Sequence, residues 1–156
     1  MSTIDNNRFL CFNLGVEEYA IPLLTVREVI AMPEVTPVPN TPAHFLGIMN
    51  LRGQVISIMD MRQKFGIKPS VNAETSVIIC EFHPVCIGVV VDSINSVINP
   101  KPNEVAETPV VNSQIKMDFI TGVFQKEAGL VIFLNIAKVL NVEDYQALNE
   151  QTAKAA

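Results

Sequence analysis

The stretch GIMNLRGQVISIMDMRQKFG, from Gly47 to Gly66, decides the fold. Two alternating apolar runs flank the tetrapeptide NLRG, and this pattern predicts a β-hairpin with a glycine in its turn. The residues that follow, MRQKFG, are typical of a short helix, which Asp60 is placed to cap. Arg52 therefore lies at the tip of the hairpin, where it can serve catalysis, anion binding or a contact with another protein.

A second block repeats this order of elements further along the chain. Aligning Gly47 with Gly122 and Asp60 with Asn135 needs a single offset of 75 residues, and both blocks read strand, turn, strand, short helix. Upstream, FNLGVEEYAIPLLTVREVI aligns with CEFHPVCIGVVVDSINSVI at an offset of 68 residues. The second half therefore carries about seven extra residues, which fall within Asn99–Met117, where a loop tolerates insertion. The sequence predicts an internal duplication.

The composition predicts one soluble globular domain. With 156 residues, 49% of them hydrophobic, and a mean hydropathy of +0.31, the chain can bury a core of its own. Its net charge of -5 and the lack of a basic run argue against nucleic acid as a partner. The longest uncharged stretch, Val35–Leu51, holds three prolines and predicts a loop rather than membrane insertion. The N-terminus does not resemble a secretory signal, so a cytoplasmic location is expected.

The remaining periodicity predicts an all-β chain with short helices. Alternating runs predict strands, besides the two of the hairpin, at residues 8–14, 18–21, 76–82, 85–92, 120–125 and 129–135. Helices are expected at residues 23–30, 60–66 and 135–140 and in the tail, with Asn141 as its cap. Each half has room for only about five strands, too few to bury much apolar surface alone. The halves must therefore pack together, leaving a groove where their surfaces diverge.

Residues with chemical reactivity do not fall into a catalytic or metal-binding pattern. His44 and His83 lack a Cys, Asp or Glu at ligand spacing, and the sequence has no CxxC or HExxH motif. It has no glycine-rich phosphate loop and no GxSxG elbow. The sequence therefore predicts no metal site, no cofactor and no catalytic residue.

The cysteines and the aspartates that follow strands receive structural interpretations. The cysteines stand in apolar runs and are interpreted as reduced core thiols; they are Cys11, Cys80 and Cys86. Asp60 and Asp92 each follow a strand, where capping of the next element is far more common than acid–base catalysis. The main alternative from another class is a small-molecule or enzymatic site that uses Cys86, His83 and Asp92.

Five successive segments resemble, in order, the motifs of the CheW-like domain family. They are FLCFNLGVEEYAI, LLTVREVI, TPAHFLGIMNLRGQVISIMDMRQKFG, VCIGVVVDSINSVI and FITGVFQKEAGLVIFLNIAKVL. The resemblance implies a single domain over residues 8–142, built as two five-stranded SH3-like barrels on a shared hydrophobic core. The first barrel would span about residues 16–68 and the second about 69–140, with the N-terminal strand bridging them and residues 143–156 as a tail.

The resemblance also implies a function. Members of the family are non-enzymatic adaptors that bridge the cytoplasmic tips of chemoreceptors to the regulatory domain of the histidine kinase CheA, and other CheW-like proteins are further candidate partners in array rings. Such a protein would lie in the cytoplasm at membrane-associated receptor arrays. Kinase contacts would fall on the turn and strand of the second barrel or on exposed loops of the first. The residues that match the family's receptor groove are Val26, Glu28, Gly47, Arg52, Val89, Val90 and Val91.

Several alternatives stay open within this family. A CheV-like protein joins the same domain to a receiver, for which 156 residues leave no room, so a free coupling protein is the expectation unless the sequence is an excised fragment. A second alternative is a structural module that builds arrays without touching receptors. Arg52 itself either contacts the partner or is a buttress, held by Glu28, that stiffens the hairpin.

Overall fold

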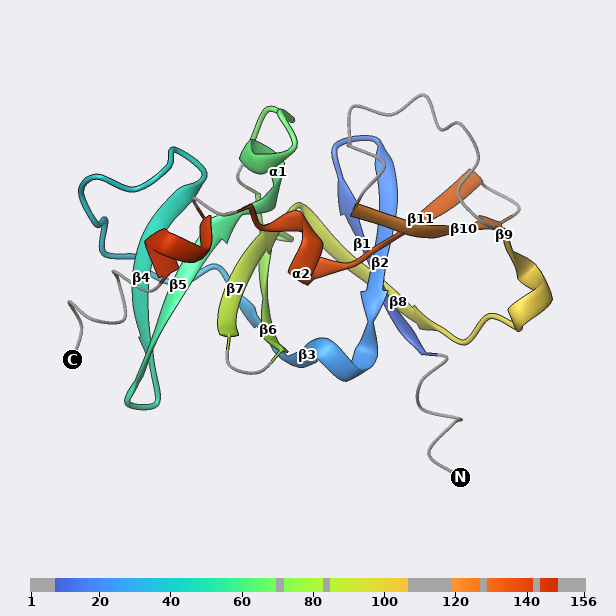
Figure 1. Cartoon of the computed structure of the whole chain (residues 1–156), viewed down its shortest axis with the longest axis horizontal. Helices are drawn as coiled ribbons and strands as arrows, with labels where there is room; N and C mark the ends of the chain where they lie inside the picture. Colours follow the sequence, from blue (N-terminus) through green and yellow to red (C-terminus); the bar gives the residue numbers. More distant parts are fainter. Residues whose placement is uncertain are drawn as a thin grey trace.

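The computed structural model describes residues 8–69, 72–82, 85–106, 119–126, 129–141 and 144–148. Within these ranges the chain folds into two mixed β-sheets with a few short helices, seen as the left and right halves of Figure 1. The six-stranded sheet has the order β8-β1-β2-β11-β10-β9, and the five-stranded sheet has the order β3-β6-β7-β5-β4. The expectation of a mostly β fold with short helices is confirmed.

The six-stranded sheet contains β1 (Phe9–Leu14), β2 (Glu17–Pro22), β8 (Ser93–Ile98), β9 (Val105–Ala106), β10 (Ile120–Lys126) and β11 (Gly129–Leu134). The five-stranded sheet contains β3 (Val26–Ala31), β4 (Phe45–Leu51), β5 (Gln54–Asp60), β6 (Ser76–Phe82) and β7 (Val85–Val91). The helical turns are η2 (Leu23–Thr25), α1 (Met61–Lys64), η3 (Pro102–Glu104) and α2 (Ile136–Val139). A short helix follows at residues 144–148. In the described ranges, no helix has the length and apolar character needed to cross a membrane.

The predicted helix at residues 23–30 is wrong. Only η2 is helical there, and β3 begins at Val26 and pairs antiparallel with β6. Along β3 the residues alternate between half-buried and exposed, so Val26, Glu28 and Ile30 share the more buried face. β-branched residues favour this pleated surface, and pairing with β6 outweighs the helix-like spacing of the valines.

The internal duplication is confirmed by strand register. Tyr19 pairs with Ile132 in the six-stranded sheet, and the equivalent Ile87 pairs with Ser57 in the five-stranded sheet. The two halves exchange strands, because β1 and β2 join the second half's β8–β11 while β6 and β7 join the first half's β3–β5. The division into residues 16–68 and 69–140 therefore does not coincide with the division into sheets.

The five-stranded sheet curls although its edge strands β3 and β4 do not pair with each other. Thr36, shortly after β3, forms an isolated bridge with Ile48 in β4. The chain from Ala31 to Thr36 can span at most about 18 Å. In a flat sheet, Ala31 on β3 and Thr36 beyond β4 would be five inter-strand spacings apart, about 24 Å, so the sheet must curl. Among the described strands, pairing alone closes neither sheet into the barrel that the family resemblance implied.

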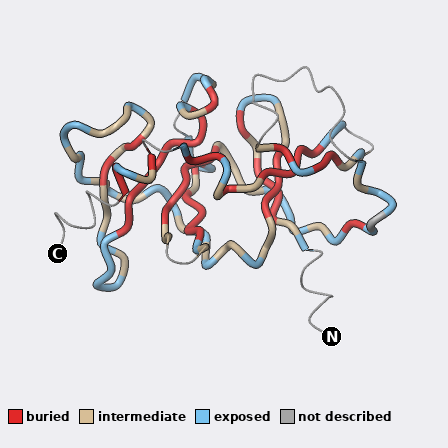
Figure 2. Tube along the Cα trace, in the orientation of Figure 1, coloured by how far each residue is buried: buried red, intermediate tan, exposed pale blue. Residues whose placement is uncertain are grey.

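The apolar side chains form three clusters, and the buried stretches in Figure 2 follow the strands of both sheets. The largest cluster joins the two sheets and includes Phe12, Tyr19, Met59, Val89 and Leu134. The second lies within the five-stranded sheet, with Ile56, Ile58, Val77, Ile79 and Val90. The third lies within the six-stranded sheet, with Cys11, Ala20, Val131 and Phe133. The core between the sheets agrees with the seam expected from the sequence.

Candidate functional site

The sequence-predicted groove residues all belong to the five-stranded sheet. Val26 and Glu28 lie on β3, Gly47 lies on β4, and Arg52 lies in the turn between β4 and β5. The remaining three, Val89–Val91, lie on the central strand β7. The order of the strands therefore places these residues at both edges and in the middle of one curled sheet.

Arg52 and Glu28 form an ion pair between the two edges of this sheet. The turn that carries Arg52 is tight, with φ of 51° at Arg52 and 88° at Gly53, and Gly53 N donates to Asn50 Oδ1 at 2.8 Å. Arg52 Nη2 donates to both carboxylate oxygens of Glu28, at 2.8 Å to Oε1. The Arg52 side chain is nevertheless 63% exposed. Because exposed ion pairs stabilise folding little, the pair chiefly fixes where the guanidinium points.

A second contact also joins β3 to the β4–β5 hairpin. Arg27 Nη1 donates to Gln54 Oε1 at 2.7 Å, so β3 and the start of β5 are joined beside the Arg52–Glu28 pair. The same nitrogen lies 3.9 Å from Cys86 Sγ. Two guanidinium groups therefore lie at the hairpin tip, Arg52 from the turn itself and Arg27 from β3, and each is held by a side chain of the other segment.

The other predicted residues are not exposed. Val89, Val90 and Val91 are fully buried in the two core clusters that meet at β7. Gly47 lies under the Thr36–Pro37 backbone, and a Cβ there would come within 2.0 Å of the Thr36 carbonyl oxygen. In this structure these four residues shape the sheet beneath the surface that Glu28 and Arg52 present.

Sequence reasoning missed Arg62, a buried charge that is paired with two carboxylates. Its guanidinium donates to both oxygens of Asp60 at 3.0 Å and to Asp92 Oδ1 at 2.9 Å, and its side chain is 3% exposed. Burial lowers the pKa of Arg62, but the two carboxylates outweigh burial and raise that pKa above its ordinary value. Asp92 Oδ2 also accepts from Gly15 N at 2.6 Å. The network thus ties the end of β5 to the β1–β2 turn of the other sheet.

The predicted roles of Asp60 and Asn141 as caps are confirmed. Asp60 accepts from Arg62 N at 2.9 Å and starts α1. Asn141 Oδ1 accepts from Asp144 N at 2.9 Å at the start of the helix at residues 144–148. The rest of the predicted tail, beyond residue 148, lies outside the described residues.

Asp144 ties this C-terminal helix to the first half of the chain. Its fully buried carboxylate lies 2.5 Å from His44 Nε2 and accepts from Lys64 Nζ at 2.7 Å. Burial raises the pKa of Asp144, but the bonds from Lys64, Asn141 and His44 outweigh burial and hold that pKa below its ordinary value of 3.8. Because a carboxylate with a lowered pKa stabilises the fold above its unfolded pKa, this contribution is lost only as the pH falls below about 4.

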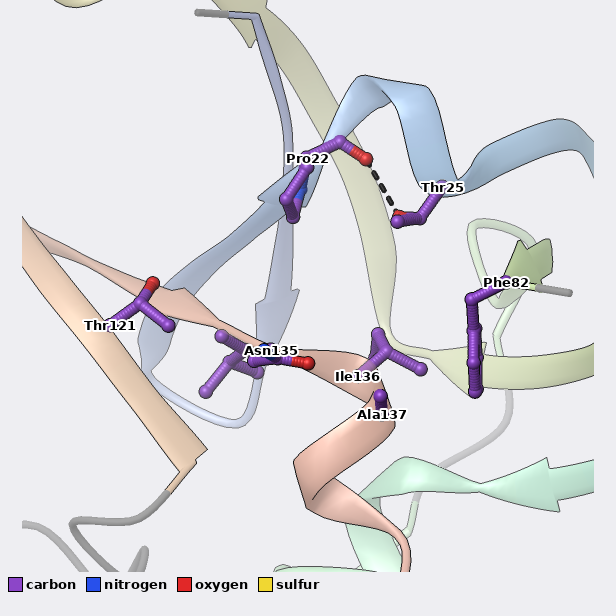
Figure 3. A pocket seen from close by; sticks show the side chains of 8 residues that line it. Pro22, Thr25, Phe82, Thr121, Asn135, Ile136 and Ala137 are labelled. Atoms are coloured by element: carbon purple, nitrogen blue, oxygen red, sulfur yellow. Dashed lines mark hydrogen bonds between the residues drawn. The ribbon is translucent and has the colours of Figure 1, made fainter. Parts of the chain in front are cut away.

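A pocket of about 160 Å³ lies between the two sheets, and Figure 3 shows its side chains around one space. Thr25 Oγ1 donates to Pro22 O at 2.7 Å at one wall of the pocket. The lining residues come from β2, η2, β6, β10, the end of β11 and the start of α2, and include Pro22, Thr25, Phe82, Thr121, Leu134, Asn135 and Ala137. None of the residues that line it carries a charge.

The alternative enzymatic site is not assembled by the described residues. Asp92 is bound to Arg62 and Gly15, Cys86 contacts Arg27, and His83 lies outside the described ranges. The described residues contain no group of three or more His, Cys, Asp or Glu side chains placed to hold a metal ion.

We expect the native cysteines to react slowly with a thiol reagent. Cys11 and Cys80 are fully buried, and burial raises their pKa values to about 11 and about 12; Cys86 is half-buried, and burial raises its pKa too. Since the thiolate is the reacting form, labelling with a maleimide at pH 7 should be much slower in buffer than in denaturant. Rapid labelling of Cys86 in the native protein would contradict this expectation and support the nucleophile alternative.

Comparison with known proteins gives consistent matches over most of the chain. Residues 8–144 match the family model of the CheW-like domain. The chain is 33% identical over 148 residues to the chemotaxis protein CheW of Klebsiella aerogenes, and the match covers 94% of this chain and 89% of that protein. It is 31% identical over 142 residues to the chemotaxis protein CheV3 of Helicobacter pylori, covering 88% of this chain and 44% of that relative. The crystal structure of the scaffolding protein TtCheW from Thermoanaerobacter tengcongensis is similar with a TM-score of 0.81 at 28% identity, covering 89% of this chain and 95% of that one.

Proposed function

Because the chain belongs to the CheW-like domain family of chemotaxis scaffolding proteins, which are not enzymes, we propose that it is an adaptor that couples chemoreceptors to the histidine kinase CheA. The receptors are the methyl-accepting chemotaxis proteins, and the adaptor would act in the cytoplasm at membrane-associated arrays. The proposal needs two surfaces, one for the helical tip of a receptor and one for the regulatory domain of CheA.

The observation that carries the receptor surface is the exposed guanidinium of Arg52, held in place by Glu28 across the curled sheet. An arginine whose direction is fixed before binding loses little side-chain entropy when a partner's polar group meets it. Recognition of a helix in a groove also needs a well-packed floor, and the buried Val89–Val91 supply it. Arg52 is therefore held by Glu28 and contacts the partner at the same time, so its two proposed roles are compatible.

We expect Arg52→Ala to weaken binding to a soluble receptor fragment by about 1 to 3 kcal/mol, as for an interfacial arginine. Titration calorimetry measures the affinity, and circular dichroism and the melting temperature check the fold. The matched control is Arg27→Ala, which removes the neighbouring guanidinium. Binding that is unchanged by Arg52→Ala rules out the anchor role, and a loss of binding that follows a lowered melting temperature favours the buttress alone.

Reconstitution tests the whole proposal. CheA and receptor-containing membranes are combined with and without this protein, and autophosphorylation of CheA is measured. We expect receptor-dependent kinase activity only when the protein is present. Separate pull-downs with CheA and with the receptor fragment then distinguish an adaptor, which binds both, from an array-building module, which does not bind the receptor.

The alternative of an array-building module has one supporting observation. Exposed apolar residues occupy equivalent positions in the two halves, with Val29 matched by Val97 and Val55 matched by Leu130. Such a pair of related surfaces suits contacts with CheA's regulatory domain or with other CheW-like proteins in rings. The CheV-like alternative, in which this domain accompanies a receiver, is supported by the match to CheV3.

A further inference from the structure

The β1–β2 hairpin is bonded to the second half of the chain, yet the chain continues from it into the first half. Its strands pair with β8 and β11, and Asn13 Nδ2 donates to Ser93 Oγ and Asn95 Oδ1, both at 2.9 Å. Glu18 accepts from Lys126 Nζ at 3.1 Å. These partners all lie beyond β7, whereas η2 leads from the hairpin into β3 of the other sheet. Figure 1 shows the blue hairpin between β8 and β11.

The same kind of exchange occurs twice within one chain. Under the offset of 68 residues, the β6–β7 hairpin is equivalent to β1–β2, and it pairs with β3 and β5 of the first half. Each repeat therefore contributes its hairpin to the sheet of the other repeat. Exchange of identical elements between copies is a low-cost route to dimers. The fold already accepts a hairpin from another repeat, so a second copy of the chain could supply the same residues to the same place.

The turn η2 has the properties of a hinge for such an exchange. Pro22, with φ of -57° and ψ of 132°, and Val26, with φ of -93° and ψ of 119°, are already extended. Only Leu23–Thr25 has to unwind for the chain to run straight from β2 into β3, and none of these three residues is buried. Opening breaks the bond from Thr25 Oγ1 to Pro22 O at 2.7 Å. The opened hinge spans up to about 14 Å, so the hairpin can reach a copy that packs against the η2 side of the molecule.

We propose that a second copy of this chain is a partner of the protein, and that the two copies exchange their β1–β2 hairpins. In the exchanged dimer each hairpin lies between β8 and β11 of the other copy and makes there the contacts that it makes in the monomer. Because these contacts are the same, the effective concentration of the tethered hairpin, of about millimolar order, sets the balance between monomer and dimer. The exchange does not depend on the adaptor function proposed above.

The wild-type chain tests the exchange without any substitution. Unlabelled and heavy-isotope-labelled protein are mixed, unfolded in urea, and refolded at about 1 mM and at about 10 μM, on either side of the expected balance. After size-exclusion chromatography, a carbodiimide joins Lys126 to Glu18, and mass spectrometry reads the isotopes of the two linked peptides. We expect a dimer fraction at least tenfold larger at the higher concentration, with mixed-isotope links in the dimer. The absence of a dimer at the higher concentration, or same-isotope links alone in the dimer, overturns the proposal.

Two pairs of introduced cysteines provide a matched control. Asn13 and Ser93 face each other across β1 and β8, so Asn13→Cys with Ser93→Cys can form a disulfide between the hairpin and its neighbour. Ala31 and Ser76 face each other across β3 and β6, and both lie beyond the hinge. On a non-reducing gel of the dimer, we expect the first pair to link two chains and the second pair to link each chain to itself. A dimer in which the first pair also links each chain to itself is an ordinary surface association, and the proposal is then wrong.

A longer hinge tests the role of η2. Insertion of a triple-glycine segment after Leu24 gives the hairpin more ways to return to its own sheet, and longer hinges disfavour exchange between copies. We expect the dimer fraction at the higher concentration to fall at least threefold, with the fold intact by circular dichroism. An unchanged dimer fraction contradicts η2 as the hinge and the exchange with it.

Discussion

Replacing Arg62 with methionine should lower the free energy of unfolding by about 3 to 5 kcal/mol, the cost of removing one partner from a buried ion network. The change leaves the carboxylates of Asp60 and Asp92 facing an apolar side chain of similar size. It also removes the link through Asp92 to Gly15, which joins the two sheets. Urea denaturation followed by circular dichroism measures the loss.

Three further variants isolate the cause of this loss. Arg62→Lys keeps the charge but not the two-pronged geometry, so its loss should be smaller than that of Arg62→Met. Arg27→Met removes an exposed arginine and should change stability by less than about 1 kcal/mol. Adding Asp60→Asn and Asp92→Asn to Arg62→Met should recover part of the stability, because no unpaired charge is then left. A loss below 1 kcal/mol for Arg62→Met would contradict the role assigned to the network.

Gly47→Ala should destabilise the fold by about 2 to 6 kcal/mol, combining backbone strain with a clash in a packed region. Gly47 has φ of 145°, and an added Cβ would lie 2.0 Å from the carbonyl oxygen of Thr36. Thr36 cannot move aside easily, because its backbone exchanges two hydrogen bonds with Ile48, of 2.8 and 2.9 Å. Thermal and urea unfolding measure the change.

Two other glycines serve as controls that separate the backbone strain of Gly47→Ala from its steric clash. Gly129 has a similar φ of 147° and has nothing within 4 Å of a built Cβ, so Gly129→Ala should cost only the strain, about 1 to 2 kcal/mol. Gly122, the counterpart of Gly47, would place its Cβ 2.8 Å from a side-chain methyl of Val105, which can shift. If Gly47→Ala is no worse than Gly129→Ala, the close approach of Thr36 does not limit substitution.

The sequence predicted most strands because their apolar alternation is local. The run SVIICEF became β6 with unchanged ends, and the NLRG hairpin formed as expected. Edge strands were harder to predict from the sequence. The edge strand β8 reads SINSVI, whose polar residues show no clean alternation, and it forms a strand because it pairs with β1. Another edge strand, β3, has valines at a helix-like spacing. It forms a strand because it pairs with β6, which lies far away in the sequence.

The candidate site was predicted only in part. The Glu28–Arg52 pair was raised as an alternative and is present, because a hairpin tip and an edge strand meet when a small sheet curls. Arg62 was missed, since in the sequence it looks like an ordinary surface charge of a short helix. The internal alignment contained the signal, because it sets Arg62 against Ala137, an exchange of a long charged side chain for a methyl. Lys64 and His44, which contact the Asp144 carboxylate, are 80 and 100 residues away from it, beyond any local pattern.

The exchange of strands between the halves imposes an order on folding during synthesis. The five-stranded sheet has its last strand once Val91 has left the ribosome, whereas β2 must wait for β11, which ends at Leu134. At typical rates of translation this interval is about 2 to 9 seconds. Throughout it β2 lacks β11, one of its two neighbours in the six-stranded sheet, so the nascent chain is most open to misassembly in that window. A chain cut between the halves would leave both sheets incomplete, and neither fragment should fold by itself.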